Sequence, residues 1–324
     1  MRAVGISTLS EGCRDIEKLG VLWLAGRVAM SGSAIWGAVP AAIVDAVFLV
    51  TLAAVMLREI VAGRNWRNLR VLIVLAVLIV GNIVFHLEVI ARGRADYGVR
   101  LGIAASIGLI VLVGGRVVPS FTHNWLTRNN PGRLPRTFSL FDALAIGGSA
   151  LALAMWIAWP QFGASGVALM AAGVLQAARL ARWAGERTFA DRLVLVLHIG
   201  YSFVPIGFLL LGAALVWPST WPASAGLHAW TAGAIGLMTL AMMTRVSLGH
   251  SGQKLAASVA TQITYICALI AALARIAATF EPSSALLYIA AFAWILAFGG
   301  FAVTFGPLLL GYPPTRGSAN NRPR

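Results

Sequence analysis

Five histidines are the side chains of this sequence best suited to chemistry. They are His86, His123, His198, His228 and His250. Imidazole is the commonest metal ligand in proteins and needs only one free ring nitrogen to bind. Three of the five lie in or at the edges of long apolar segments, where an ionisable group is costly and therefore marks a functional candidate. The histidines are thus the first candidates for a metal or cofactor site.

The apolar segments sort these histidines into two levels. His86 lies near one end of its segment and His228 at the start of another, which predicts that both lie near one face of a membrane. His198 lies about six residues from the other end of its segment, roughly 9 Å deep. His123 and His250 lie at that same end. The first pair could supply two axial ligands to a haem, and the inner three a nitrogen-rich copper site; helix capping is the alternative for each.

Other polar and sulfur side chains have helical spacing to these positions. Asn82 precedes His86 by four residues and Tyr201 follows His198 by three, so each pair shares a helix face. A hydrogen-bonded shell around a metal ligand has this pattern, as does a polar contact between helices. Met238 and Met242, four residues apart, offer thioethers to Cu(I), although core packing is the favoured interpretation.

Nine apolar segments are long enough to cross a membrane, which takes about 20 residues. They cover residues 35–57, 69–90, 99–118, 138–159, 163–181, 192–217, 227–246, 256–279 and 285–310. A tenth, at 18–32, is shorter and contains Arg27. The continuous apolar runs lack the alternation of barrel strands. The sequence predicts an all-α, polytopic transmembrane bundle of about ten spans over 18–312, with an unassigned tail at 1–17 and a disordered cytoplasmic tail at 313–324.

The composition excludes a water-soluble protein. Hydrophobic residues make up 59% of the chain, charged residues 11%, and the mean hydropathy is +0.83, whereas soluble domains carry about 25% charged residues. A net charge of +14 would suggest nucleic acid in a soluble protein, but no basic patch is interleaved with base-stacking aromatics. The predicted partner is therefore the lipid bilayer and not nucleic acid.

Basic residues predict the orientation of the spans. Most of the 25 Lys and Arg residues fall on one side of the predicted spans, and this side is cytoplasmic by the positive-inside rule. Both termini should therefore be cytoplasmic. Arg92, Arg94 and Arg100 cluster on the other side. They could form an anion site, such as one for haem carboxylates, or their clustering could be chance. Asp45 lies within a span and either pairs with Arg27 or is protonated.

The remaining local patterns predict structure more than chemistry. No Walker motif, C-x-x-C pair or H-E-x-x-H motif is present in the sequence, so ATP-driven transport and haem attachment through a C-x-x-C-H motif lack support. The polar stretch from His123 to Arg136 predicts a cytoplasmic loop. Gly166 and Gly173 share a segment and suit close helix packing.

Several segments resemble a known family. Residues 113–122 (VGGRVVPSFT) resemble the G-G-R-V-I-P-x-F-T motif of the NnrS family, and residues 228–252 resemble its second signature. The stretches NIVFHLE at 82–88, LHIGYSFVP at 197–205 and AWILAF at 293–298 also fit. The resemblance covers residues 20 to 312. Family members usually begin with about a hundred further residues that include two spans and a His-rich motif, so we expect a shortened start or a shorter subgroup.

The resemblance implies a setting and a set of positions. NnrS members are integral membrane proteins of about twelve helices, described as containing haem and copper and associated with the bacterial response to nitric oxide and nitrosative stress. Carried onto this chain, the cofactor or metal positions are His86, His198, His228 and His250. The resemblance adds Asn82 and Arg116 as supporting polar groups, beside Tyr201.

The expected function follows from these residues and the resemblance together. We expect a multi-pass protein of the bacterial inner membrane that binds haem, with copper as a second metal, and that acts on nitric oxide or a related small molecule. The alternative is a secondary transporter of a small molecule or metal, with a broken helix near Pro205 and an intramembrane charge at Asp45. The sequence assigns no reaction, no catalytic residue and no oligomeric state.

Overall fold

The computed structural model describes residues 4–281 and 283–310, with side chains from Lys18 onward. Across these residues the chain is helical and contains no strand. Nine of the described helical segments are long and apolar enough to cross a membrane. The expected all-α transmembrane fold is therefore confirmed. The tail predicted at 313–324 lies outside the described residues.

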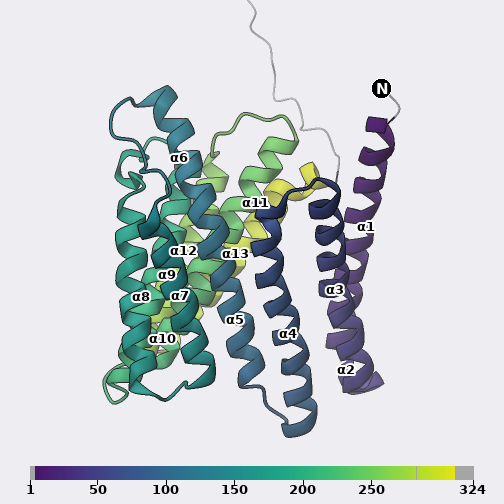
Figure 1. The fold of residues 1–324 in the computed structure, drawn as a ribbon, viewed down its shortest axis with the longest axis vertical. Helices are drawn as coiled ribbons and strands as arrows, with labels where there is room; N and C mark the ends of the chain where they lie inside the picture. The colour runs from purple at the N-terminus through teal and green to yellow at the C-terminus, as the bar shows by residue number, and fades with distance from the viewer. Residues whose placement is uncertain (1–3, 282, 311–324) are drawn as a thin grey trace, which may run out of the picture. The chain divides into compact units, whose positions relative to one another are not determined.

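The chain divides into two compact units, the first ending at Leu109 and the second beginning at Ile110. The helices of the first are α1 (Val4–Ser31), α2 (Ser33–Trp36), α3 (Ala38–Ala62), α4 (Leu69–Arg92) and α5 (Tyr97–Leu109), with a 3-10 turn at Trp66–Asn68. Each long helix packs against the next, α1 on α3, α3 on α4 and α4 on α5, and α1 lies beside α3 along its length (Figure 1).

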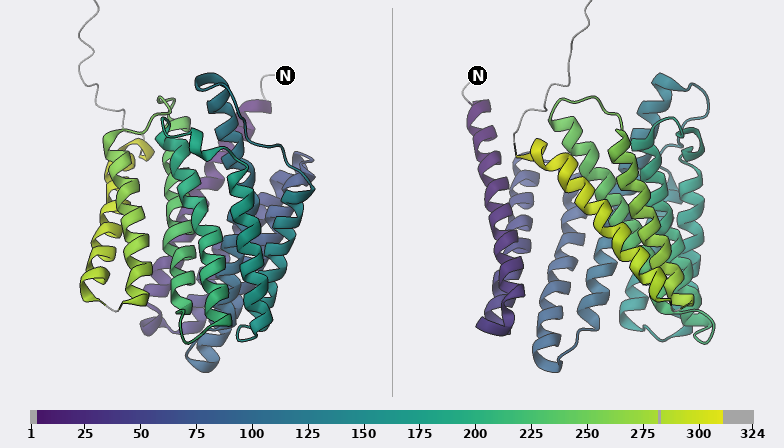
Figure 2. Two further views of the ribbon diagram at one scale, coloured as in Figure 1. Left: turned by 90° about the vertical axis from the view of Figure 1, so that its left-hand side faces the viewer. Right: turned by 180° about the vertical axis from the view of Figure 1, so that it is seen from behind.

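The second unit is built around one central helix, α9 (Arg192–Val216). The other elements are the π-helix η2 (Ile110–Gly114), α6 (Gly115–Asn129), α7 (Leu140–Ala158), α8 (Gly163–Ala181), η3 (Gly185–Arg187), α10 (Ala223–His228), the π-helix η4 (Ala229–Gly236), α11 (Leu237–His250), α12 (Val259–Phe280) and α13 (Ser284–Leu309). α6, α8, α10, η4 and α11 all contact α9, and α12 and α13 pack against each other (Figure 2). Of the candidate spans, α9 is the most deeply buried.

Small residues allow the neighbours of α9 to approach closely. A Cβ atom built on Gly166 of α8 would lie 2.8 Å from the carbonyl oxygen of Gly212, and one built on Gly212 would lie 2.7 Å from the carbonyl oxygen of Gly166. Gly173 packs on Leu209 in the same interface. The packing role predicted for Gly166 and Gly173 is thus confirmed, because small residues let membrane helices gain dispersion contacts that lipid does not supply.

Two element boundaries differ from the predicted ones. The helix α6 continues to Asn129, so the loop expected from His123 was wrong in its first half. Helix α1 begins at Val4, inside the segment expected as an N-terminal tail, and the shorter predicted segment at 18–32 forms its second half; α1 is not among the nine described segments apolar enough to span. Hydropathy predicts only the part of a helix that lies in lipid. The helix itself continues beyond the apolar residues, to the point where its terminal backbone groups are capped.

α9 also runs without a break through Pro205. The transporter interpretation expected a broken helix at that point, and this ground for it is removed. The indole nitrogen of Trp230 in η4 donates to the carbonyl of Val204 at 3.1 Å, so a side chain from a neighbouring element contacts the backbone beside the proline.

We predict that Gly207→Ala destabilises the protein, because the added Cβ would lie 2.2 Å from Cδ1 of the buried Trp230 ring. Overpacking of this kind costs about 1–3 kcal/mol. The measurement is the free energy of unfolding in detergent titrated with dodecyl sulfate. Gly147→Ala is the control, since nothing lies within 4 Å of its Cβ position, and it should change stability by about 1 kcal/mol or less. Equal effects would contradict this packing.

Candidate functional site

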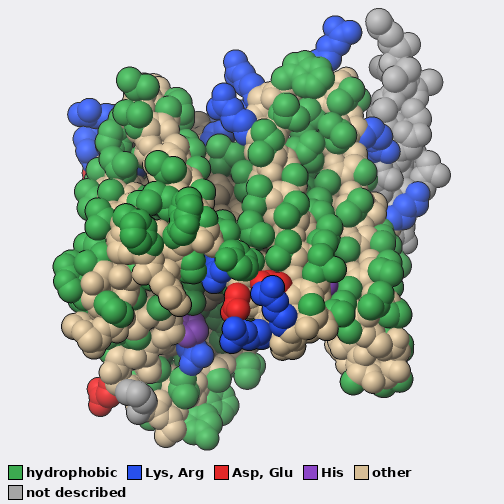
Figure 3. Space-filling model, turned by 60° about the horizontal axis from the view of Figure 1, so that its bottom comes forward, with side chains coloured by type: hydrophobic (Ala, Val, Ile, Leu, Met, Phe, Trp, Pro, Cys, Tyr) green, Lys and Arg blue, Asp and Glu red, His purple; other side chains and the backbone are tan. Residues whose placement is uncertain are grey.

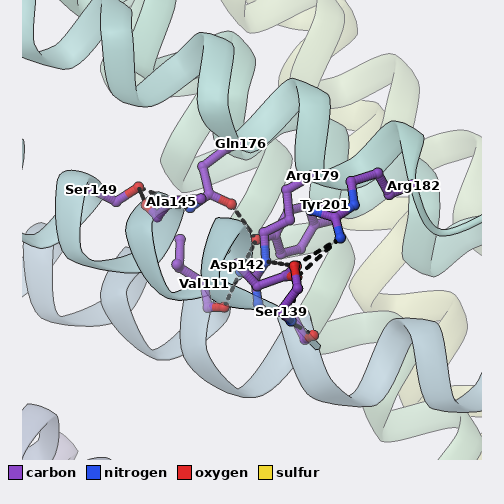
Figure 4. A network of polar contacts seen from close by, with 10 residues as sticks. Val111, Ser139, Asp142, Ala145, Ser149, Gln176, Arg179, Arg182 and Tyr201 are labelled. Carbon is purple, nitrogen blue, oxygen red and sulfur yellow. Dashed lines mark hydrogen bonds and ion pairs between the residues drawn. The ribbon is translucent and has the colours of Figure 1, made fainter. Parts of the chain in front are cut away.

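A buried ion pair between α7 and α8 is the most elaborate polar site of the second unit. The Arg179 and Asp142 side chains are 1% and 7% exposed, and Nε of Arg179 donates to Oδ1 of Asp142 at 3.2 Å. Both residues belong to segments long and apolar enough to span a membrane. Because a charge in that setting must be paired within the protein, the surrounding contacts explain how the pair persists (Figure 4).

Asp142 is held by the first turn of α7. Ser139 and Asp142 form a capping box, in which the Ser139 backbone N–H donates to Oδ2 of Asp142 at 3.0 Å and the Ser139 hydroxyl donates to the same oxygen at 2.9 Å. A carboxylate near a helix N-terminus also faces the positive end of the helix dipole. Arg182 lies 3.5 Å from the same carboxylate. The capping box therefore holds the Asp142 carboxylate beside the end of α8, where Arg179 and Arg182 lie.

The guanidinium of Arg179 takes its other partners from an irregular helix. Its Nη1 donates to the carbonyl of Val111 at 3.0 Å, and its Nη2 reaches the carbonyl of Gly115 at 3.4 Å. Val111 lies in the π-helix η2, where the regular backbone hydrogen bonds are interrupted. Pro119 lacks the N–H that would occupy the carbonyl of Gly115. The stretch from η2 to Pro119 thus supplies two carbonyl oxygens that accept from one cation.

Glycine makes room for this cation. A Cβ atom built on Gly115 would lie 2.3 Å from Nη2 of Arg179. The neighbouring Gly114 faces Tyr201 and Met238, with its Cβ position 3.4 Å and 3.2 Å from their nearest atoms. A side chain at Gly115 would displace the guanidinium, whereas a Cβ on Gly114 would meet the tyrosine ring at ordinary contact distance. The geometry therefore needs the smallest residue at Gly115.

A chain of hydrogen bonds continues from the ion pair into the core. The Tyr201 hydroxyl accepts from Nη1 of Arg179 at 3.3 Å and donates to Oε1 of Gln176 at 2.8 Å. Nε2 of Gln176 donates to the hydroxyl of Ser149 at 2.9 Å. Such a fully connected network ties α7, α8 and α9 together. Its polar groups are engaged with one another, so it is suited to positioning the helices.

Tyr201 is among the site residues that the sequence predicts, whereas Arg179, Asp142 and Gln176 are not. In the sequence, Arg179 resembles any basic residue at a cytoplasmic helix end. Two signals were available. Ser139 followed three residues later by Asp142 matches a capping box, and the predicted spans place Asp142 and Arg179 at the same membrane level.

His198 is held one turn before Tyr201 on α9. The Thr122 hydroxyl donates to the carbonyl of Val118 at 2.9 Å, and its oxygen lies 2.7 Å from Nε2 of His198. Because a hydroxyl has one proton, His198 must donate from Nε2. Its other nitrogen faces η3, where a Cβ atom on Gly185 would lie 2.5 Å from Nδ1. His198 is therefore a tightly packed helix-to-helix contact in the structure.

His228 differs from His198 in having no such partner. It is the last residue of α10, directly before η4, and its side chain is partly exposed. Neither ring nitrogen makes a hydrogen bond to any described residue. Arg275 of α12 is close enough to His228 to act on it electrostatically. The imidazole is therefore free to bind a ligand.

Within the first unit, Asp45 gathers three polar side chains. Arg27 donates to its Oδ1, which confirms the predicted pairing. Nδ2 of Asn82 donates to Oδ2 at 2.8 Å, and Nε2 of His86 lies 3.2 Å from the same oxygen. Asn82 and His86 therefore share a helix face as expected. A carboxylate on one imidazole nitrogen is also the arrangement found behind many metal-ligating histidines.

The arginines after α4 are interleaved with acidic groups. Glu88 accepts three backbone N–H groups, from Asp96 at 3.0 Å, Tyr97 at 3.1 Å and Gly98 at 2.8 Å, and so caps the start of α5. Arg94 pairs with Asp96 at 3.4 Å. Figure 3 shows basic and acidic side chains side by side on the face that it views. The anion site expected from this loop stays a prediction.

The other expected positions lie apart from these contacts. Arg116, His123 and His250 are exposed, and the described residues include no group of three His, Cys, Asp or Glu side chains placed to hold a metal ion. The inner trio of His123, His198 and His250 is therefore not assembled. Met238 is buried against Gly114 and Gly200, which agrees with core packing.

A comparison with known families identifies the family of the chain. The chain matches the family described as NnrS protein over residues 14–312. The protein belongs to the NnrS family. No curated protein and no solved structure matches it. With its apolar helices, it is a multi-pass membrane protein. The first NnrS-like signature, at 113–122, begins at the end of the π-helix η2, and the second, at 228–252, contains the π-helix η4.

We predict that Arg179→Gln destabilises this NnrS protein by about 3–5 kcal/mol, because Asp142 would remain buried without its closest cation. Unfolding in detergent titrated with dodecyl sulfate measures the loss. Arg182→Gln is the matched control, since Arg182 is 20% exposed and lies farther from the carboxylate; it should cost about 1 kcal/mol or less. A larger loss for the control would contradict the assignment of Arg179 as the main partner.

Proposed function

We propose that this NnrS protein binds haem through His228 and takes part in the bacterial response to nitric oxide at the inner membrane. The NnrS family assignment supports the setting, and the nine apolar helices support the bilayer as its environment. The observation that carries the proposal is the free imidazole of His228 beside the π-helix of the second signature.

The environment of His228 fits a residue that would hold a haem. Both ring nitrogens lack a hydrogen-bond partner among the described residues, so one is available without breaking a contact. Arg275 supplies a positive charge nearby, which would complement the carboxylates of a haem. π-helices occur frequently at functional sites, and η4 begins at the next residue.

The surroundings of the inner histidines do not support a copper site there. A nitrogen-rich copper site needs several imidazoles around one ion, and no group of three ligating side chains occurs among the described residues. Nε2 of His198 is already engaged with Thr122. We therefore assign no copper site to His198 and His250.

His86 is the other histidine that the proposal retains. Its contact with Asp45 occupies Nε2, while Nδ1 makes no hydrogen bond to the described residues. Asp45 fixes the orientation of the ring, as carboxylates do behind metal-bound imidazoles. His86 belongs to the first unit and His228 to the second, so each is proposed as a separate ligand position.

The proposed role is protection against nitric oxide by scavenging it or by guarding metal centres. Haem supplies an iron centre that binds diatomic molecules, with reactivity set by the surrounding polar groups. In this chain, His228 would hold the cofactor and Arg275 would orient it. With most basic residues on one side of the spans, both termini are proposed to face the cytoplasm.

We predict that His228→Ala lowers the haem content of the purified protein roughly tenfold or more, because the proposed axial ligand is lost. His123→Ala is the control, since His123 is an exposed residue of α6 outside the proposed site. The measurement is the haem absorbance per protein after expression with ample iron, with and without added nitric oxide. A nitric oxide-dependent shift of the haem band is expected in the wild type.

Equal haem content in the two variants would contradict the assignment of His228. Wild-type protein that is colourless and free of haem under these conditions would contradict the proposed function itself.

A further inference from the structure

A groove on the second unit runs between α9 and α12. It has a volume of about 340 Å³. Its walls come from residues 192–199 of α9 and 262–269 of α12, with a contribution from α11 through Leu237. Each run of eight residues makes seven steps, which at 1.5 Å per residue gives a length of about 10 Å.

The groove is polar at one end and apolar at the other. Arg192 and Gln262 lie in the first turns of α9 and α12, and Tyr265 lies one turn further along α12. The opposite end is lined by aliphatic side chains that include Ile199 and Leu269. A ligand that fits this surface has a polar or charged head and an apolar tail.

The positive charge of Arg192 determines that the polar head of the ligand is an anion. Its side chain is exposed and makes no ion pair or hydrogen bond with the described residues. The adjacent carboxylate of Asp191 instead caps α9 and accepts the backbone N–H groups of Leu193 and Val194, at 2.9 Å and 3.3 Å. Arg192 thus remains available to an anion at the mouth of the groove.

We propose that this groove binds one anionic phospholipid, with its phosphate on Arg192 and the start of an acyl chain along α9 and α12. Basic pockets between membrane helices bind anionic headgroups in this way. A free phosphate would leave the aliphatic wall uncovered, and a neutral lipid would gain little from the arginine. The site is separate from His228 and does not depend on haem.

The test is the number of lipids retained by the purified full-length chain. The protein is equilibrated with equal amounts of phosphatidylglycerol and phosphatidylcholine in mild detergent, and native mass spectrometry counts bound lipids. The wild type should retain phosphatidylglycerol in preference to phosphatidylcholine. Arg192→Gln should lower that preference about fivefold, the effect of one basic residue near a lipid phosphate. Arg128→Gln, at an exposed arginine of α6, should leave it unchanged.

A second pair of variants tests the apolar wall. Ile266 lines the groove and is 56% exposed, whereas Ile263 is 55% exposed on the same helix and does not line it. Ile266→Trp should fill the groove and reduce retention of phosphatidylglycerol several-fold, while Ile263→Trp should not. These positions lie on the surface of α12, so neither change disturbs the core.

Three results would overturn the proposal. They are equal retention of the two lipids by the wild type, retention by Arg192→Gln that matches the wild type, and complete displacement of the lipid by millimolar inorganic phosphate. The last result would indicate a simple anion site in which the apolar wall has no part.

Discussion

A guanidinium inside a membrane helix must find all its partners within the protein, and Arg179 imposes this constraint on the second unit. Asp142 supplies the opposite charge, and Tyr201 and two backbone carbonyls supply the remaining acceptors. These partners come from four different elements. Removing water from such a pair is costly, so the surrounding geometry must be good for the pair to persist. The register of α7, α8 and α9 therefore depends on one side chain.

This constraint gives a physical reason for the signature from Gly114 to Pro119. Gly115 leaves space for the guanidinium, and Pro119 leaves a carbonyl unoccupied. The carbonyl of Val111 in the preceding π-helix also accepts from Arg179. A glycine and a proline that would each weaken an ordinary helix thus act together. About one turn after Pro119, Thr122 of α6 contacts His198 of α9.

The sequence predicts the spans well because lipid demands about 20 apolar residues wherever a helix crosses. It also offers the pairing of Arg27 with Asp45 as one of two alternatives, beside a protonated Asp45, and the structure contains the pair. It did not reveal Arg179 as a buried cation, because a basic residue near a helix end has the same local pattern whether it faces water or the core. Which histidines are engaged also depends on packing. His198 and His228 both belong to apolar segments, and only the structure distinguishes a packed ring from a free one.

The most direct measurement is a double-mutant cycle between Gly115 and the ion pair, by unfolding in detergent. Gly115→Ala should cost about 1–3 kcal/mol in the wild type, where its Cβ meets the guanidinium. In the Asp142→Asn/Arg179→Ala background the same change should cost about 0.5 kcal/mol or less, because the cation is gone. An equal cost in both backgrounds would contradict the claim that this glycine is present to accommodate Arg179.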